Sequence, residues 1–217
     1  MNPSANAPQG VRAAGPEETE TPRVSARVGL LADRDFVEVR FCGSGGQGLL
    51  LMGLILAVAA NHDHRCVVQT ESYGPEARGG HSRSDVIISD TAIDYPTLDS
   101  ADLLVALSQE AADGYTRSLR REGILMYDSG KVTNPPSFPG MTIGVPFTRL
   151  ATEETGRPQT TNVLTLGAVV GITGVVSVES LTKAVMEAVP AGTTEVNARA
   201  LARGLALDYA EWMVDSC

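Results

Sequence analysis

The sequence predicts a mixed α/β fold, in which helices flank a mostly parallel sheet and a helical segment closes the chain. Residues 36–42 form an apolar strand pattern that runs into a glycine-rich turn and then a Leu- and Ala-rich helix at 49–60, as at the start of an α/β unit. Further short apolar runs follow, separated by polar or glycine-containing turns. Helical patterns dominate the last third. This combination is Rossmann-like.

Each element follows from its local pattern. Residues 1–35 are rich in Ala, Pro, Gly, Glu and Thr without periodicity, which predicts a disordered leader, so the folded domain is expected at 36–217. Further strands are expected at 66–70, 84–89, 101–107, 123–128 and 141–146, the 101–107 strand central and the last at an edge because of Pro146. Helices are expected at 109–119, 147–155, 162–171, 178–189 and 197–214, with Ser177 as an N-cap and with small residues in 162–171 that allow close packing.

Composition limits the classes of partner. The 217 residues carry a net charge of −9, which argues against nucleic acids and anionic membrane surfaces as partners because both are polyanions. The longest apolar run, 49–60, is too short to span a bilayer. Three widely spaced cysteines form no C-x-x-C pair, which predicts reduced thiols in a cytoplasm and no zinc or iron–sulfur site held by this chain.

The glycine-rich turn is the first candidate binding motif. It consists of Gly43, Ser44, Gly45, Gly46, Gln47 and Gly48, and its strand–turn–helix context suits a phosphate because backbone N–H groups and a helix N-terminus are exposed there. A dinucleotide site also needs an acidic residue about 20 positions later, at the end of the second strand. Glu71 follows Gly48 by 23 residues but is expected inside the next loop. The alternative is that the glycines only permit tight strand–helix packing.

The second motif is a loop that combines stiff and flexible residues with charge. It contains Tyr73, Gly74, Pro75, Glu76, Ala77, Arg78, Gly79 and Gly80. An arginine beside two glycines can grip a phosphate or a carboxylate through both fork donors. Glu76 can instead hold Arg78 in a structural ion pair, and the residues alone leave both readings open.

The remaining polar residues form no complete catalytic set. His81, Arg83 and Asp85 follow the second motif, and His62 and His64 form an H-x-H pair in a polar turn that is expected to be solvated. The sequence contains no Walker A lysine and no nucleophile elbow. The sequence thus offers a turn suited to binding an anion and a loop with an arginine, but no catalytic groups. This combination suits a subunit that contributes one wall of a shared site.

The two motifs together resemble one family. Residues 41–48 are similar to the G-x-G-G-Q-G opening of the γ subunits of 2-oxoacid:ferredoxin oxidoreductases, and residues 72–80 are similar to that family's S-Y-G-P-E-x-R-G-G loop. Residues 84–90, 99–107 and 162–178 also fit the family's pattern, so the resemblance covers residues 37–190. The first 35 residues have no counterpart in the compact members.

The resemblance implies a role within a larger enzyme. Such enzymes convert a 2-oxoacid, CoA and oxidised ferredoxin into an acyl-CoA, CO2 and reduced ferredoxin. Thiamine diphosphate and Mg²⁺ lie mainly between the α and β subunits, and [4Fe–4S] clusters lie on β and on a ferredoxin-like δ subunit. The γ subunit is a Rossmann-like domain that binds no cofactor wholly by itself. The residues of the second motif most resemble those of 2-oxoglutarate enzymes. An assembly that passes electrons to NAD through a flavin subunit is the alternative to one that uses ferredoxin.

The hypothesis that follows concerns the two motifs. The Gly43–Gly48 turn and Arg78 would face the entry of CoA and bind its phosphate or the 2-oxoacid carboxylate. Two alternatives remain, a purely architectural subunit whose motifs shape an interface and a free-standing nucleotide-binding α/β protein. The missing acid at the end of the second strand counts against the latter.

Overall fold

The computed structural model describes residues 1, 29–73 and 81–214. Its elements, in chain order, are β1 (Phe36–Ser44), α1 (Leu49–His62), β2 (Cys66–Tyr73), β3 (His81–Ser89), β4 (Ala101–Ala106), α2 (Gln109–Tyr115), β5 (Leu119–Asp128), β6 (Met141–Val145), α3 (Phe147–Thr155), α4 (Thr161–Thr173), α5 (Val178–Ala188) and α6 (Thr194–Leu205). Short 3₁₀ turns follow α2, α3, α5 and α6. None of the helices in these residues is long and apolar enough to cross a membrane.

The six strands form one sheet in the order β2-β3-β1-β4-β5-β6. Strands β1, β4, β5 and β6 are parallel neighbours, whereas β3 runs antiparallel to both β1 and β2. The predicted mostly parallel sheet is therefore confirmed. So are the central position of β4, which is buried along its whole length, and the edge position of β6.

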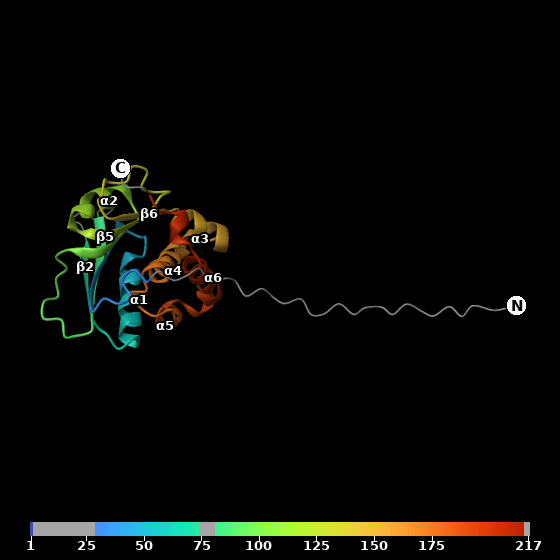
Figure 1. The fold of residues 1–217 in the computed structure, drawn as a ribbon. Helices are drawn as coiled ribbons and strands as arrows, with labels where there is room; N and C mark the ends of the chain where they lie inside the picture. Colours follow the sequence, from blue (N-terminus) through green and yellow to red (C-terminus); the bar gives the residue numbers. More distant parts are fainter. Residues whose placement is uncertain (2–28, 74–80, 215–217) are drawn as a thin grey trace.

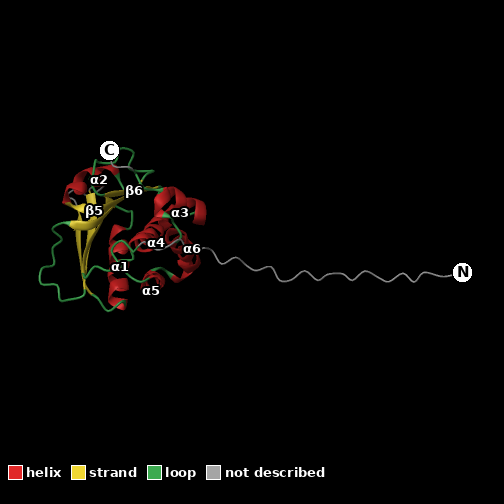
Figure 2. Cartoon of the chain, viewed as in Figure 1, coloured by secondary structure: helices red, strands yellow, loops and turns green. Residues whose placement is uncertain are grey.

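Helices cover the two faces of the sheet unequally. Helices α1 and α3–α6 lie on one face, and α2 lies on the other (Figure 1). Because side chains alternate along a strand, β1 sends Val37, Val39 and Phe41 into the larger core and Cys42 into the smaller one. The C-terminal third is helical, as expected, and its helices gather on the larger-core side (Figure 2).

The connections create a crevice at the middle of the sheet. From β1 the chain passes through α1 to β2 at one edge, and from β4 it passes through α2 to β5 on the opposite side. β1 and β4 are hydrogen-bonded neighbours. The carboxyl ends of β1 and β4 therefore border the point at which the winding direction reverses, where open α/β sheets bind ligands.

Helices α4 and α6 approach each other closely through glycines. A Cβ atom on Gly204 would collide with the carbonyl oxygen of Leu164, and one on Gly167 would lie 2.6 Å from the carbonyl oxygen of Leu201. The expectation of a closely packed small-residue helix at 162–171 is thus confirmed. This contact fixes α4, whose first turn faces the candidate site.

Residues 29–35 differ from the expected leader. They were expected to belong to a disordered leader, yet Leu31 is 3% exposed and its backbone N–H donates to the carbonyl of Thr173. Arg34 forms an ion pair with buried Asp102. These residues pack on the domain because one leucine and one arginine find buried partners far away in sequence. Residues 2–28 lie outside the described chain.

Several element boundaries were predicted wrongly, since β3 starts at His81 and β5 at Leu119, both earlier than expected. β2 continues through Glu71 to Tyr73 because it pairs with β3 along its whole length, so Glu71 lies in a strand and not in a loop. α2 ends at Tyr115, where the Thr116 and Ser118 hydroxyls bond to the last carbonyls of the helix. α6 ends at Leu205, and residues 212–214 pair with β6 in place of the predicted helix.

Candidate functional site

The glycine-rich turn joins β1 to α1 through two residues with left-handed backbone conformations. Gly46 has φ +88° and Gly48, the N-cap of α1, has φ +75°, conformations that glycine adopts at little cost. A side chain at Gly48 would also meet Asn162 at 2.7 Å. Position 48 thus requires a glycine, both because of its left-handed backbone conformation and because α4 lies so close.

Gln47 ties the turn to the neighbouring strand. Its side-chain Oε1 accepts a hydrogen bond from the backbone N–H of Ser44 at 2.6 Å, and its Nε2 donates to the carbonyl of Leu107 at 2.8 Å. The amide lies against Gly43, since a Cβ atom there would collide with Oε1. One side chain therefore links the carboxyl ends of β1 and β4.

A cleft of about 350 Å³ opens beside this turn. It is lined by Gly46, Gln47, Gly48, Leu107, Lys131, Thr148, Pro158, Gln159, Thr161 and Asn162. The N-terminal ends of α1 and α4 meet there, and neither helix has an acidic residue in its first turn. At α4 the Thr161 N–H donates to the Pro158 carbonyl and the Val163 N–H donates to the Asn162 side chain, whereas Gly48 caps α1 without a side chain. Uncapped N–H groups at a helix N-terminus attract anions.

Lys131 supplies the positive charge of this cleft. Lys131 is exposed, and its side chain makes no hydrogen bond or ion pair within the described residues. Buried Asp128 holds the turn that carries it, because one carboxylate oxygen accepts from the Gly130 N–H and the main-chain carbonyl accepts from the Lys131 N–H. The other carboxylate oxygen accepts from Thr148 at the start of α3. The cleft therefore combines an exposed ammonium group with the N-terminal ends of two helices, a chemistry that suits an anionic ligand.

The strand register brings the two sequence motifs to one edge of the sheet. Ser44, in the glycine-rich turn, is paired with His81, and Tyr73 at the end of β2 is paired with Ser82. Tyr73 and His81 flank the second motif. The remaining residues of that motif, Gly74, Pro75, Glu76, Arg78, Gly79 and Gly80, lie outside the described chain, so their role stays a prediction.

Comparisons with known proteins identify the family. The model of the pyruvate ferredoxin/flavodoxin oxidoreductase family matches residues 38–207. The 2-oxoglutarate synthase subunit KorC of Methanocaldococcus jannaschii is 44% identical over 170 residues, which cover 77% of this chain and 91% of KorC. The chain belongs to the γ-subunit family of 2-oxoacid:ferredoxin oxidoreductases.

Two further relatives agree with this assignment. The crystal structure of the keto/oxoacid ferredoxin oxidoreductase γ subunit from Geobacter sulfurreducens is 41% identical and superimposes with a TM-score of 0.75, covering 82% of this chain and 99% of that chain. The ketoisovalerate oxidoreductase subunit VorA of Methanothermobacter marburgensis is 40% identical over 145 residues, which cover 65% of this chain and 30% of VorA. The γ-subunit sequence is thus similar both to a separate chain and to part of a longer one.

Sequence reasoning missed Lys131, Thr148 and Asn162 as cleft residues of this γ-subunit fold. Lys131 follows the carboxyl end of β5, and that position is the signal that points to it, because ligands of parallel sheets bind at this edge. Asn162 and Thr148 reach the cleft from helices that are distant in sequence. No local pattern marks them.

Two lesser candidates beyond the second motif are structural in the γ-subunit fold. Asp85 accepts two hydrogen bonds from the guanidinium of buried Arg40, at 2.7 and 2.8 Å, and Arg83 lies 3.5 Å from the same carboxylate. Both arginines stack on the ring of Tyr115. Arg40 and Asp85 therefore form a buried ion pair, with the partly exposed Arg83 beside it. The side chain of His81 lies outside the described side chains.

The cysteines occupy separate environments. Cys42 is fully buried, and burial raises the pKa of its thiol, whereas Cys66 is exposed on β2. Cys217 lies outside the described residues. Within the described part of the chain, no group of three or more His, Cys, Asp or Glu residues is placed to hold a metal ion.

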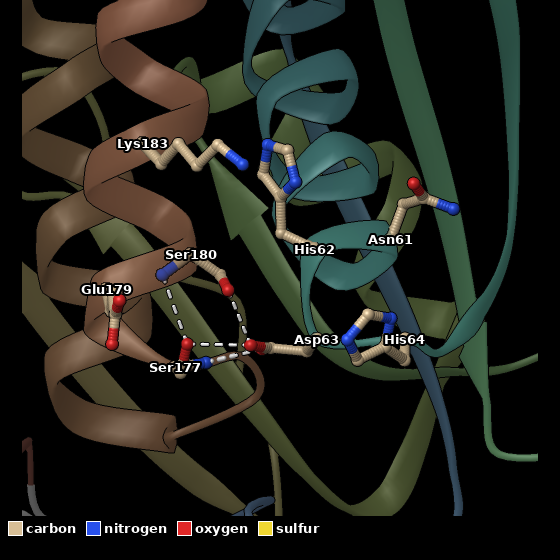
Figure 3. A pocket seen from close by; sticks show the side chains of 8 residues that line it. All are labelled: Asn61, His62, Asp63, His64, Ser177, Glu179, Ser180 and Lys183. Atoms are coloured by element: carbon tan, nitrogen blue, oxygen red, sulfur yellow. Dashed lines mark hydrogen bonds between the residues drawn. The ribbon is translucent and has the colours of Figure 1, made fainter.

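A second cleft lies between the C-terminus of α1 and the N-terminus of α5 (Figure 3). The rings of His62 and His64 do not converge there, and His62 hydrogen-bonds to Glu187 at 3.1 Å. Asp63 accepts hydrogen bonds from the Ser177 N–H and from the hydroxyls of Ser177 and Ser180. Ser177 in turn accepts from the Ser180 N–H, which confirms it as the N-cap of α5. The hydrogen bonds of Asp63 therefore hold the C-terminus of α1 against the N-terminus of α5.

Replacing Asp63 by asparagine is expected to lower the melting temperature at pH 7 by about 2–4 °C, as for a lost helix cap in a domain of this size. Burial opposes the charge of Asp63, but the hydrogen bonds from Ser177 and Ser180 hold the pKa of its carboxyl below the ordinary value. A lowered pKa contributes stability that is present above the unfolded-state pKa of about 3.9 and is lost as the pH falls through the folded-state pKa.

Melting curves of the two proteins between pH 7 and pH 3 test this sign. The gap between wild type and Asp63→Asn is expected to narrow as the medium becomes acidic. A gap that is constant or widens toward low pH would show that the Asp63 charge does not contribute. Asp208→Asn, at a 3₁₀ turn whose Asp208 side chain accepts a single bond from Ala210, serves as the control.

Proposed function

We propose that this chain is the γ subunit of a multisubunit oxidoreductase that converts a 2-oxoacid, CoA and oxidised ferredoxin into an acyl-CoA, CO2 and reduced ferredoxin. The observation that carries this proposal is the 44% identity to KorC over 91% of its length. The same relative favours 2-oxoglutarate as the substrate, with a branched-chain 2-oxoacid as the second candidate because VorA is 40% identical. The isolated chain is expected to be inactive.

The cofactors are assigned to partner subunits. In the whole enzyme, thiamine diphosphate with Mg²⁺ supplies the carbanion chemistry of decarboxylation, and [4Fe–4S] clusters accept the electrons. In the described part of this chain Cys42 is sealed inside the domain and Cys66 lies on another strand, so these two thiols do not fit a cluster. The α, β and δ subunits would hold these groups, in a cytoplasmic assembly that passes electrons to ferredoxin or, through a flavin module, to NAD.

The contribution of this chain is a wall that binds anionic groups at the CoA entry. Backbone N–H groups at the start of α1 and the Lys131 ammonium face the same cleft of about 350 Å³. A CoA phosphate or the substrate carboxylate provides the matching charge. Arg78, from the second motif, is the further proposed donor, and the β2–β3 pairing ends at the same sheet edge as the turn. This wall holds CoA in place, and the chemistry occurs on the partner subunits.

Replacing Lys131 by alanine in the intact complex is expected to raise the apparent KM for CoA about tenfold while kcat changes little. A charge-assisted hydrogen bond contributes roughly 1.5–3 kcal/mol, and tenfold in affinity corresponds to about 1.4 kcal/mol. Initial rates of viologen dye reduction at varied CoA, with saturating 2-oxoglutarate, measure both constants.

Lys183 is the matched control. The chain has two lysines, and Lys183 lies exposed at the second cleft, on α5. Lys183→Ala is expected to leave both constants unchanged. If Lys131→Ala and Arg78→Ala both leave the affinities for CoA and 2-oxoacid unaltered, the anion-binding role fails and the architectural reading of the two motifs takes its place.

The free-standing nucleotide-binding alternative has lost support. In a dinucleotide-binding fold the ribose-binding acid ends the strand beside the first strand. Here the antiparallel β3 separates β1 from β2, so Glu71 lies one strand farther from the glycine-rich turn. A 2-oxoacid panel with CoA and a viologen dye tests the proposed reaction. Absence of any CoA-dependent dye reduction by the purified complex would reject it.

A further inference from the structure

Gln47 occupies the place at which a Rossmann-type glycine turn receives a phosphate. In that fold the turn after the first strand offers backbone N–H groups to a pyrophosphate lying in the crevice where the sheet winding reverses. In this chain the crevice lies between β1 and β4. The Ser44 N–H at its border already donates to the Oε1 of Gln47, at 2.6 Å.

The other half of the same amide closes the opposite border. The Nε2 of Gln47 donates to the carbonyl of Leu107 at 2.8 Å, just beyond the end of β4. Gly43 lies under the amide, and any Cβ atom there would collide with Oε1. Both polar ends of the Gln47 side chain are satisfied, so the side chain fills the crevice with a bonded amide.

We infer that Gln47 is a specificity-determining residue that excludes pyrophosphate from the β1–β4 crevice. It confines anionic ligands to the cleft beside the turn that Lys131 lines, here called the outer cleft. The turn keeps its glycine spacing, but its inner donor, the Ser44 N–H, is withheld from ligands. The donors left for an anion are those at the outer side of the turn, where Gly46 and Gly48 line the cleft with Lys131. A phosphate that lies above the turn is admitted, whereas a pyrophosphate lying along the β1–β4 crevice is not.

The Gly48–Asn162 contact supports the same separation between the β1–β4 crevice and the outer cleft. Asn162 is 9% exposed, and its side chain packs on Gly48 at the first turn of α1. Gln47 thus faces β4 while Gly48 faces α4, and the turn is fixed from both sides. The inference concerns the same turn as the proposed function, yet it is independent of which anion the enzyme uses.

The test uses inorganic pyrophosphate as the probe and the full-length, ¹⁵N-labelled chain. Backbone amide shifts are followed during titration in three proteins, namely wild type, Gln47→Ala and Gln47→Met. Alanine empties the crevice, whereas methionine fills nearly the same volume without hydrogen bonds. We expect the Ser44 amide to respond to pyrophosphate in Gln47→Ala with an apparent affinity at least about tenfold tighter than in wild type or Gln47→Met.

Amide hydrogen exchange separates the hydrogen bond from the filled volume. The Ser44 N–H is expected to exchange at least about tenfold faster in both variants than in wild type, because both lose its acceptor. Gln109→Ala is the control, since the Gln109 amide makes the same paired contact with the backbone of Asn134 on another turn. Its Ser44 amide should behave as in wild type.

The outcomes separate this inference from the proposed function. A Ser44 amide that responds to pyrophosphate equally in wild type and Gln47→Ala, or in neither, would overturn the inference. Responses of Gly46 and Gly48 in all three proteins would support the anion cleft. If Gly46 and Gly48 stay silent while Ser44 responds in Gln47→Ala, the inference about Gln47 stands and the anion-binding role of the outer cleft fails.

Discussion

Replacing Asp85 by asparagine is expected to lower the free energy of unfolding by about 3–5 kcal/mol, because it leaves the Arg40 guanidinium buried without its counter-charge. Arg40 is 3% exposed and Asp85 4% exposed, and two short hydrogen bonds join them. Burial alone would lower the pKa of Arg40, but the hydrogen bonds and the charge of Asp85 hold it above its ordinary value. Urea denaturation at pH 7 measures the loss.

An exposed ion pair provides the comparison for this result. Arg149 and Glu153 lie 3.6 Å apart on α3 with both side chains more than half exposed. Glu153→Gln is expected to change stability by less than about 0.5 kcal/mol. Equal losses of unfolding free energy in Asp85→Asn and Glu153→Gln would show that the Arg40–Asp85 pair does not stabilise the domain as predicted.

Replacing Gly204 by alanine is expected to destabilise the domain by about 1–3 kcal/mol, against the intrinsic preference of helices for alanine. The new methyl group would collide with the carbonyl oxygen of Leu164 and lie 2.9 Å from the backbone nitrogen of Ala168. Backbone atoms of a packed helix cannot move aside as a flexible side chain can, so α4 and α6 must separate. Thermal melting measures the effect as a fall of several degrees.

The opposite sign is expected at another helical glycine. Gly114 lies in α2, and no atom is within 4 Å of a Cβ built there. Gly114→Ala is therefore expected to stabilise the protein by up to about 1 kcal/mol, from helix propensity alone. A stabilising Gly204→Ala would mean that the α4–α6 contact is looser than described. Because α4 brings Asn162 to the cleft, a separation of these helices is also expected to weaken anion binding.

Local sequence patterns predicted most elements of the fold because each pattern reflects a local cause. The strand before the glycine turn, the buried strand at 101–107 and the Ser177 cap all depend on alternation, continuous apolarity or one side-chain oxygen. The insertion of β3 between β1 and β2 depends on pairing between strands, which no local pattern encodes. The burial of Leu31 and the pairing of residues 212–214 with β6 are tertiary effects of the same kind.

The candidate site was predictable in part. The glycine turn was found from its spacing and context, and the structure places it beside a cleft at the carboxyl edge of the sheet. Lys131 was missed because a lone lysine after a strand gives a weak signal until the strand is known to be parallel and internal. The function of Gln47 was not predicted because the turn alone does not reveal that Leu107 lies within hydrogen-bonding distance.

The assembly of this chain into a larger 2-oxoacid oxidoreductase can be measured on the purified protein. Native mass spectrometry of the protein, tagged and purified from its own source at low oxygen, shows whether partner subunits accompany it. We expect a complex in which the 22.8 kDa chain is accompanied by partner subunits that carry thiamine diphosphate and iron–sulfur clusters. A single 22.8 kDa species that has no partners and binds a nucleotide by itself would show that the chain is not such a subunit.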